Sequence, residues 1–141
     1  MLNFITWILF FIAAIAPHTD KNSKSSIKLK DGTYVGSSLA QYTNEPYKGT
    51  VKIVINENKI TKVEFQIVDT TANEIFGSDY EKHYPNNETY RQQCRNDWNG
   101  VIHYQKELLK KQDIDAVDAV SGATWSYNIF KASVKKALVN K

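Results

Sequence analysis

The chain has 141 residues, the size of one domain, and carries a formal charge of +3 at pH 7. Its lysines are scattered among acidic residues along the chain, which argues against a nucleic-acid-binding protein, because such a surface needs a dense, one-sided basic stripe. The single cysteine, Cys94, excludes an intramolecular disulfide and is expected to be structural, and His18, His83 and His103 lack the spacing of a metal site.

The first predicted element is an apolar segment from Phe4 to Ala16, which Pro17 ends. It is short for a membrane span and has the length of a signal-peptide core, so we expect residues 1–17 to be a signal peptide or a membrane anchor. No Lys or Arg precedes the segment and proline is a poor residue after a cleavage point, so an uncleaved anchor stays open, as does a buried core helix. Export by either route predicts an extracytoplasmic protein, periplasmic or anchored on the outer face of a membrane.

A polar linker, rich in Ser and Lys, is predicted over residues 18–30, because this segment has no hydrophobic period. The folded domain is predicted over residues 31–141. It opens with a short β-prone piece at 33–35, which Gly36 is expected to end.

Two longer runs, 49–55 and 59–68, follow on either side of a turn predicted at 56–58. Apolar and polar side chains alternate along both runs, which is the pattern of strands that bury one face and expose the other. Because the connection is short, we expect the two runs to form an antiparallel hairpin.

Two helices are predicted in the second half of the chain, after a segment, 69–86, that has no clean period and predicts no element. The first spans 87–111, and Asn99-Gly100 leaves open whether it is one helix or two; the second spans 126–139. Their apolar stripes are interpreted as core, and the expected fold class is α+β, a small antiparallel sheet with helices packed on it. The stripe residues are Tyr90, Cys94, Trp98, Val101, Tyr104 and Leu108, then Ile129, Phe130, Val134, Ala137 and Leu138.

A run of small residues, Ser121-Gly122-Ala123-Thr124, lies directly before the last predicted helix. Glycine lets a ligand approach the main chain, and the start of a helix presents unpaired N–H groups, so this place favours an anion, above all a phosphate or a phosphoester on Thr124. A plain helix cap, by Thr124 or Ser126, is the competing interpretation. Nucleophilic catalysis by Thr124 or Ser121 would need a base such as His103 to arrive by folding.

The segment Asp118-Ala119-Val120-Ser121-Gly122-Ala123-Thr124 resembles the signature of the FMN-binding domain family, which is an Asp, two variable residues, Ser or Thr, Gly, Ala and Thr or Ser. These are small extracytoplasmic flavoproteins related to flavinylated subunits of sodium-translocating NADH:quinone oxidoreductases. The runs from Asp31 to Gly36, from Tyr47 to Val51 and from Lys59 to Phe65 resemble the front half of that domain. The similarity extends over residues 31–141, with 69–110 unassigned.

The resemblance implies that FMN is attached covalently, through a phosphoester, to Thr124. It implies that Asp118, Ser121, Gly122 and Ala123 surround the phosphate and are recognised by a separate exported FMN transferase, which takes FMN from FAD with magnesium. The flavin ring would also need an aromatic shelf, for which Trp125, Tyr34 and Tyr127 are candidates.

The resemblance thus implies an electron-transfer flavoprotein outside the cytoplasm that relays electrons between redox partners, and is an electron carrier more than a stand-alone enzyme. The chain has no G-x-G-x-x-G loop for a nicotinamide cofactor, so a partner protein or membrane complex must supply the electrons. Two alternatives stay open: a flavin reductase domain acting on a small extracellular acceptor, and a noncovalent binding or adaptor module in which Thr124 only caps a helix.

Overall fold

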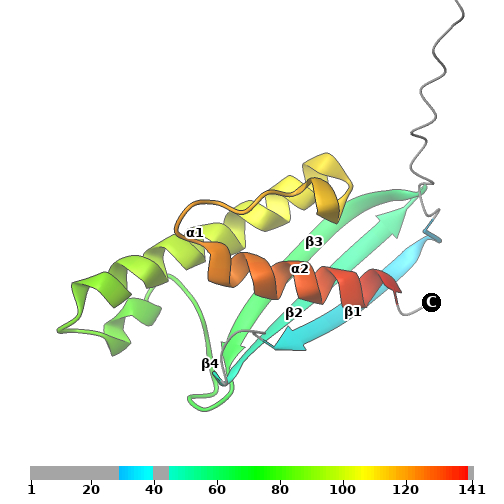
Figure 1. The fold of residues 1–141 in the computed structure, drawn as a ribbon. Helices are drawn as coiled ribbons and strands as arrows, with labels where there is room; N and C mark the ends of the chain where they lie inside the picture. Colours follow the sequence, from blue (N-terminus) through cyan, green and yellow to red (C-terminus); the bar gives the residue numbers. More distant parts are fainter. Residues whose placement is uncertain (1–28, 40–44, 140–141) are drawn as a thin grey trace, which may run out of the picture.

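A four-stranded antiparallel sheet, with strand order β1-β2-β3-β4, carries two α-helices on one face in the computed structural model (Figure 1). The structure describes residues 29–39 and 45–139, so the predicted leader and most of the predicted linker lie outside the described residues. The strands are β1 (Gly32–Leu39), β2 (Tyr47–Asn56), β3 (Lys59–Asp69) and β4 (Glu74–Ile75). The helices are η1 (Tyr80–His83), α1 (Glu88–Lys111), η2 (Ile114–Ala116) and α2 (Thr124–Val139).

The predicted hairpin is confirmed as β2 and β3, the centre of the sheet. Val51, Ile53 and Ile55 are buried beneath the helices while the intervening residues are more exposed, as period-2 alternation requires. Glu57 and Asn58 connect the strands with φ angles of 51° and 60°, left-handed values that match the right-handed twist of a hairpin. The expected fold class, α+β, is therefore confirmed.

The strand β1 continues through Gly36 to Leu39, so the prediction that Gly36 ends it was wrong. A Cβ atom on Gly36 would lie 2.2 Å from the Ser133 carbonyl oxygen and 2.3 Å from the Ala137 backbone nitrogen. The glycine is thus required by the close approach of α2 and not by a break in the strand.

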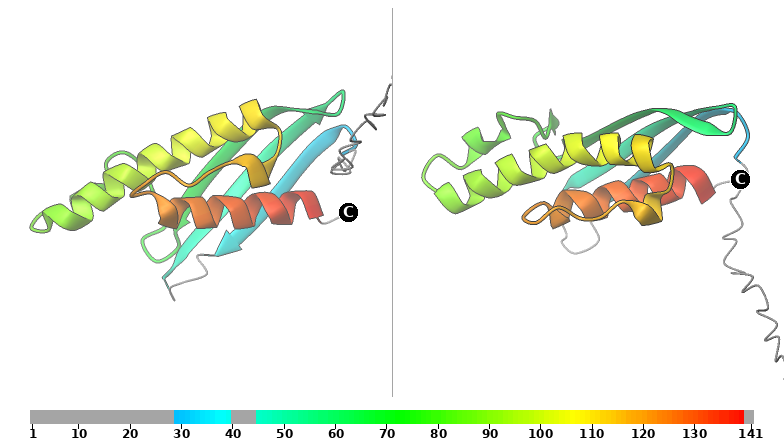
Figure 2. Two further views of the ribbon diagram at one scale, coloured as in Figure 1. Left: turned by 45° about the horizontal axis from the view of Figure 1, so that its top comes forward. Right: turned by 90° about the horizontal axis from the view of Figure 1, so that it is seen from above.

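The helix α1 is one helix of 24 residues that runs unbroken through Asn99-Gly100. Gly100 marks where α2 crosses it: an added Cβ would lie 2.8 Å from the Ala123 Cβ and 2.9 Å from the Ser126 Oγ. The side chain of Asn87 caps its N-terminus by accepting from the Tyr90 N–H at 3.2 Å. The views in Figure 2 show α1 and α2 lying over the same face of the sheet.

The segment between β3 and α1, for which the sequence predicts no element, is ordered by polar contacts and two buried rings. Phe76 and Tyr80 are each 3% exposed. Arg91 and Arg95 of α1 pair with Glu81 of η1, and both also contact Glu88. In the described segments, 29–39 and 45–139, no helix combines the length and the apolar character that a bilayer crossing needs.

We predict that Gly36→Ala lowers the free energy of unfolding by about 3 kcal/mol, because backbone atoms of α2 occupy the space of the new methyl group and the helix must move. Urea unfolding followed by circular dichroism measures the change. Gly77→Ala is the matched control, since its Cβ would meet nothing nearer than the Asp79 carboxylate at 3.5 Å. An equal effect of the two substitutions would show that helix α2 does not approach β1 this closely.

Candidate functional site

The loop that carries Asp118 to Thr124 is held from beneath by one buried hydroxyl. Tyr104, fully buried on α1, accepts from the Val120 N–H at 3.1 Å and donates to the Ala123 carbonyl at 2.9 Å. A single hydroxyl group thereby fixes both ends of the four-residue stretch Val120 to Ala123. Burial raises the pKa of Tyr104, so the hydroxyl stays a donor over the physiological range.

Gly122 and Ala123 let the loop lie directly against α1. Gly122 has φ +79°, and an added Cβ there would lie 2.8 Å from the Asn96 amide nitrogen, so a side chain would be both strained and crowded. Its carbonyl accepts from the Gln93 amide at 2.9 Å. Ala123 is 1% exposed and packs at the Gly100 crossing. Small residues are therefore needed here for packing, whatever the loop binds.

The start of α2 is capped by a residue of the other helix. Ala123 precedes the first residue, Thr124, and has no side-chain oxygen to cap with. The Asp97 carboxylate, 2% exposed on α1, instead accepts from the Ser126 N–H at 3.0 Å and from the Ser126 hydroxyl at 2.7 Å. The interpretation of Thr124 or Ser126 as the cap is therefore wrong, as is the prediction that the helix begins at 126. Both residues belong to the first turn.

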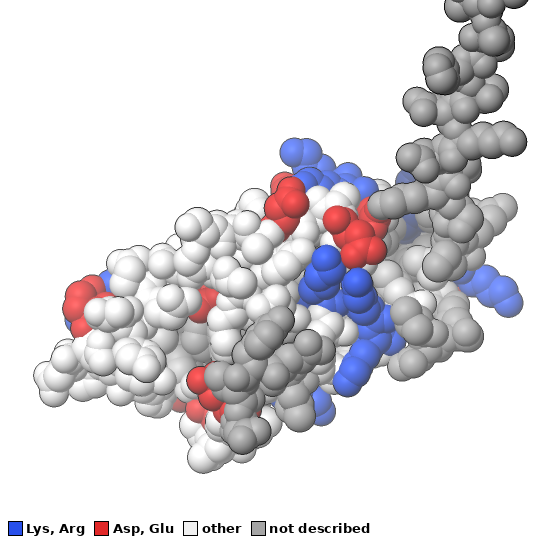
Figure 3. All heavy atoms as spheres, viewed as in Figure 1, with Lys and Arg blue, Asp and Glu red and all other residues white. Residues whose placement is uncertain are grey.

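Asp97 satisfies only the third N–H of the helix. Within residues 29–39 and 45–139, the N–H groups of Thr124 and Trp125 have no hydrogen-bond partner, and the Thr124 side chain is exposed. Figure 3 shows Lys and Arg gathered over the C-terminal half of α2, where Lys131 and Lys135 pair with Asp115, and few charged side chains over its N-terminal half. An anion bound at Thr124 would thus be held by helix N–H groups and the helix dipole.

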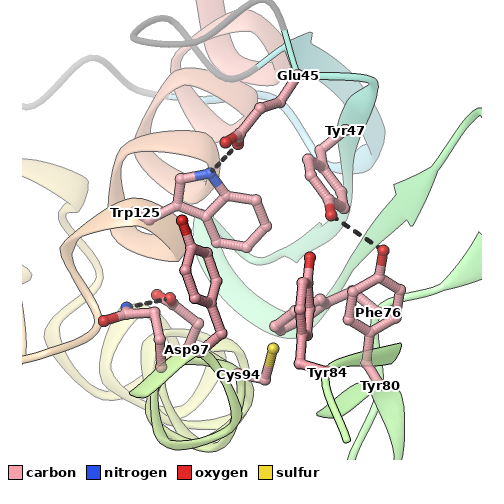
Figure 4. Close-up of a pocket in the computed structure, with 10 residues that line it drawn as sticks. Glu45, Tyr47, Phe76, Tyr80, Tyr84, Cys94, Asp97 and Trp125 are labelled. Atoms are coloured by element: carbon pink, nitrogen blue, oxygen red, sulfur yellow. Dashed lines mark hydrogen bonds between the residues drawn. The ribbon is translucent and has the colours of Figure 1, made fainter. Parts of the chain in front are cut away.

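A pocket of about 190 Å³ opens beside this helix start and is walled by aromatic rings (Figure 4). The rings come from β2, the segment between β4 and α1, α1 itself and the first turn of α2. Trp125 forms one wall, with its ring 5.0 Å from Tyr47 and 5.3 Å from Phe76, and its indole N–H donates to Glu45 at 3.2 Å. The aromatic lining residues are Tyr47, Phe76, Tyr80, Tyr84, Tyr90 and Trp125.

Two tyrosines of the pocket wall, Tyr47 and Tyr80, are uncharged at neutral pH. Burial raises the pKa of Tyr47 to about 12 and, together with a hydrogen bond to Asp69, raises that of Tyr80 well above its usual value. Burial also raises the pKa of the Cys94 thiol, which lies at the pocket wall. Neutral rings of this kind suit a flat, largely apolar ligand.

The structure gathers four of the five predicted site residues at the start of α2: Ser121, Gly122, Ala123 and Thr124. Asp118 is elsewhere, with its carboxylate 90% exposed and 3.4 Å from the Lys111 ammonium. Ser121 is exposed in the turn before the helix, and His103 is an exposed residue of α1 whose ring lies 5.7 Å from that of Tyr104.

Of the three shelf candidates, only Trp125 lines the pocket. The hydroxyl of Tyr34 donates to the Lys30 carbonyl, and that of Tyr127 donates to the Val117 carbonyl. The sequence interpretation missed the other aromatic lining residues and the capping role of Asp97. One signal was present, since Phe76, Tyr80 and Tyr84 recur every four residues, but no element could be assigned to them.

Comparison with known proteins identifies a family. The model of the FMN-binding domain matches residues 44–139. A crystal structure of a Clostridium perfringens protein is similar, with 28% identity and a TM-score of 0.62 over 79% of this chain and 88% of that one. A solution structure of a Clostridium thermocellum protein covers 80% of this chain and 94% of its own, with 21% identity and a TM-score of 0.45. No match was found among curated proteins.

We predict that Asp97→Ala destabilises the fold by about 3 kcal/mol and lowers the melting temperature by about 10 °C, because it leaves the buried N–H of Ser126 without its acceptor and leaves the Ser126 hydroxyl only the Ala123 carbonyl. Differential scanning calorimetry measures both quantities. The control is Asp118→Ala, which removes an exposed carboxylate from the same region and should leave the melting temperature unchanged. An Asp97→Ala protein that melts with the wild type would show that the carboxylate does not cap α2.

Proposed function

The chain belongs to the FMN-binding domain family, and from this premise we propose that it carries FMN through a phosphoester on Thr124 and relays electrons between redox partners outside the cytoplasm. The observation that carries the proposal is the juxtaposition, at one helix start, of an exposed threonine, free N–H groups and an aromatic pocket. When bound, FMN supplies one- and two-electron transfer.

The start of α2 fits the phosphate. The exposed Thr124 hydroxyl offers the oxygen for an ester, and the N–H groups of Thr124 and Trp125 can donate to the remaining phosphate oxygens. The buried Asp97 carboxylate is already engaged by Ser126 and Gln93, which spread its charge over hydrogen bonds within the protein.

The aromatic pocket fits the isoalloxazine ring. Trp125 follows Thr124 directly in the chain and forms a pocket wall, so a ligand tethered at Thr124 reaches the pocket without a long connection. The tyrosine and phenylalanine walls exclude water from the flat faces of a ring, and the tyrosine hydroxyls offer hydrogen bonds at its edge. The chain's own residues thus bind and orient the cofactor.

The exposed part of the motif is suited to recognition by an FAD-dependent FMN transferase. Asp118 and Ser121 are exposed in a loop that Tyr104 holds in one conformation. In the transfer, the Thr124 oxygen forms a bond to the flavin-side phosphorus of FAD, and the bond between the two phosphates breaks. The hydroxyl proton is released and AMP departs.

The location follows from residues 1–17, proposed to be a signal peptide or a membrane anchor. A covalent tether suits such a location, because a cofactor outside the cytoplasm would otherwise diffuse away. The redox partner is proposed to be a protein or a membrane complex.

The test is intact mass of the full chain coexpressed with the transferase. We expect the wild type to gain the mass of FMN less one water, Thr124→Ala to gain nothing, and Thr124→Ser, which keeps a hydroxyl, to be modified. Thr61→Ala, which removes an exposed threonine hydroxyl of β3 outside the motif, is the control and should gain the same mass as the wild type. The same spectrum shows whether residues 1–17 have been removed.

Two outcomes would contradict the proposal. Added mass on the Thr124→Ala protein would show that the ester forms on another residue. An unmodified wild type without yellow colour would return the domain to the noncovalent adaptor interpretation.

A further inference from the structure

A chain of hydroxyl groups leads from a buried carboxylate into the aromatic pocket. The Tyr80 hydroxyl donates to Asp69 Oδ2 at 2.6 Å, and the hydroxyls of Tyr47 and Tyr80 are 2.9 Å apart. Asp69, 8% exposed at the end of β3, does not line the pocket, whereas Tyr47 and Tyr80 do. The carboxylate therefore acts on the pocket only through the tyrosines.

The carboxylate fixes the direction of the hydrogen bonds. Hydrogen bonds from Tyr80 and from the N–H groups of Ala72 and Thr71 hold the pKa of Asp69 below its usual range, so the group is ionised and can only accept. The Tyr80 hydroxyl must therefore be the donor in its hydrogen bond with Asp69. The Tyr80 oxygen accepts a hydrogen bond from the Tyr47 hydroxyl. The Tyr47 oxygen can then act toward a ligand only as an acceptor.

Tyr84 also lines the pocket beside these two tyrosines. Figure 4 shows the hydroxyls of Tyr47, Tyr80 and Tyr84 converging at one side of the pocket. Since the Tyr47 proton is committed to Tyr80, a bond between Tyr84 and Tyr47 must run from Tyr84. In either arrangement, the last oxygen of the chain faces the pocket as an acceptor.

The other oxygen and nitrogen groups of the lining either form hydrogen bonds within the protein or are exposed to water, as Glu45 and Tyr90 are. Glu45 accepts from Trp125, and Asp97 accepts from Ser126 and from Gln93, whose amide also donates to the Gly122 carbonyl. Tyr90 is 55% exposed, so water competes for its hydroxyl. The tyrosine chain is therefore the polar feature by which the pocket can distinguish ligands of similar shape.

We propose that Asp69 is a positioning residue that makes this pocket a hydrogen-bond acceptor and so selects aromatic rings that present an N–H at their edge. The inference rests on the proposed function in one respect, which is that the ligand is a flavin. In an oxidised isoalloxazine the only ring N–H is at N3, so the tyrosine hydroxyl groups recognise that position.

The substitution Asp69→Asn is expected to reverse the direction of the hydrogen bonds among the tyrosines, with little change in the shape of the pocket. Asp69 Oδ1 accepts from the N–H groups of Thr71 and Ala72, so an asparagine keeps its carbonyl there and turns its NH₂ group toward Tyr80. Tyr80 then accepts from the asparagine NH₂ group and donates its own hydrogen bond to the Tyr47 oxygen. The Tyr47 hydroxyl is left to donate into the pocket, which presents a donor in place of an acceptor.

The experiment measures the affinities of riboflavin and N3-methylriboflavin, by quenching of flavin fluorescence, for the full chain expressed without the transferase. The wild type should bind riboflavin about tenfold more tightly, because methylation removes the N3–H donor. In Asp69→Asn the preference should disappear. The bulk of the methyl group is the same in both proteins and cancels in the comparison.

Asp79→Asn is the matched control, because Asp79 is an exposed carboxylate that pairs with Lys82 outside the pocket, and this variant should keep the tenfold preference. Thermal unfolding verifies that Asp69→Asn is folded. Tyr80→Phe keeps the Asp69 side chain but removes the hydroxyl that links it to Tyr47, so this variant should also lose the preference. Riboflavin binding with equal preference in wild type and Asp69→Asn would overturn the role of Asp69 and leave the flavin pocket standing. No riboflavin binding to the wild type would overturn both the pocket assignment and the inference.

Discussion

The buried carboxylate of Asp97 is the constraint on which the rest of the site depends. A carboxylate removed from water must have its oxygens satisfied, and here the satisfaction comes from the first turn of α2 and from Gln93. That requirement joins the two helices at the Gly100 crossing. The loop between them must then close over Tyr104, and Trp125 is directed into the pocket wall.

The fold was predictable wherever burial repeats with a regular period. Strands β2 and β3 alternate every two residues and α1 carries a stripe every three or four, so their type and extent could be read from the sequence. The segment 69–86 could not, because its order comes from ion pairs to Arg91 and Arg95, which lie on another element. The start of α2 was misplaced for the same reason, since its cap is supplied by α1 and not by its own sequence.

The candidate site likewise has one part that could be predicted from the sequence and one part that could not. The small residues and Thr124 are contiguous, and the local chemistry of a helix start made them recognisable from sequence. The pocket is assembled from Tyr47, Phe76 and Trp125, which are far apart in the chain and meet only after the sheet and helices have packed. Nothing in the spacing of these residues connects them, so tertiary structure was needed to find the pocket.

The two hydrogen bonds of Tyr104 also bear on when the motif loop loses its conformational freedom. Because a buried side chain holds both ends of the stretch from Val120 to Ala123, the backbone entropy of the loop is lost as the core forms and not when an enzyme or a phosphate arrives. A modifying enzyme would therefore meet a rigid epitope that exists only in the folded chain. Loading of the cofactor would then follow folding in time and discriminate against misfolded copies.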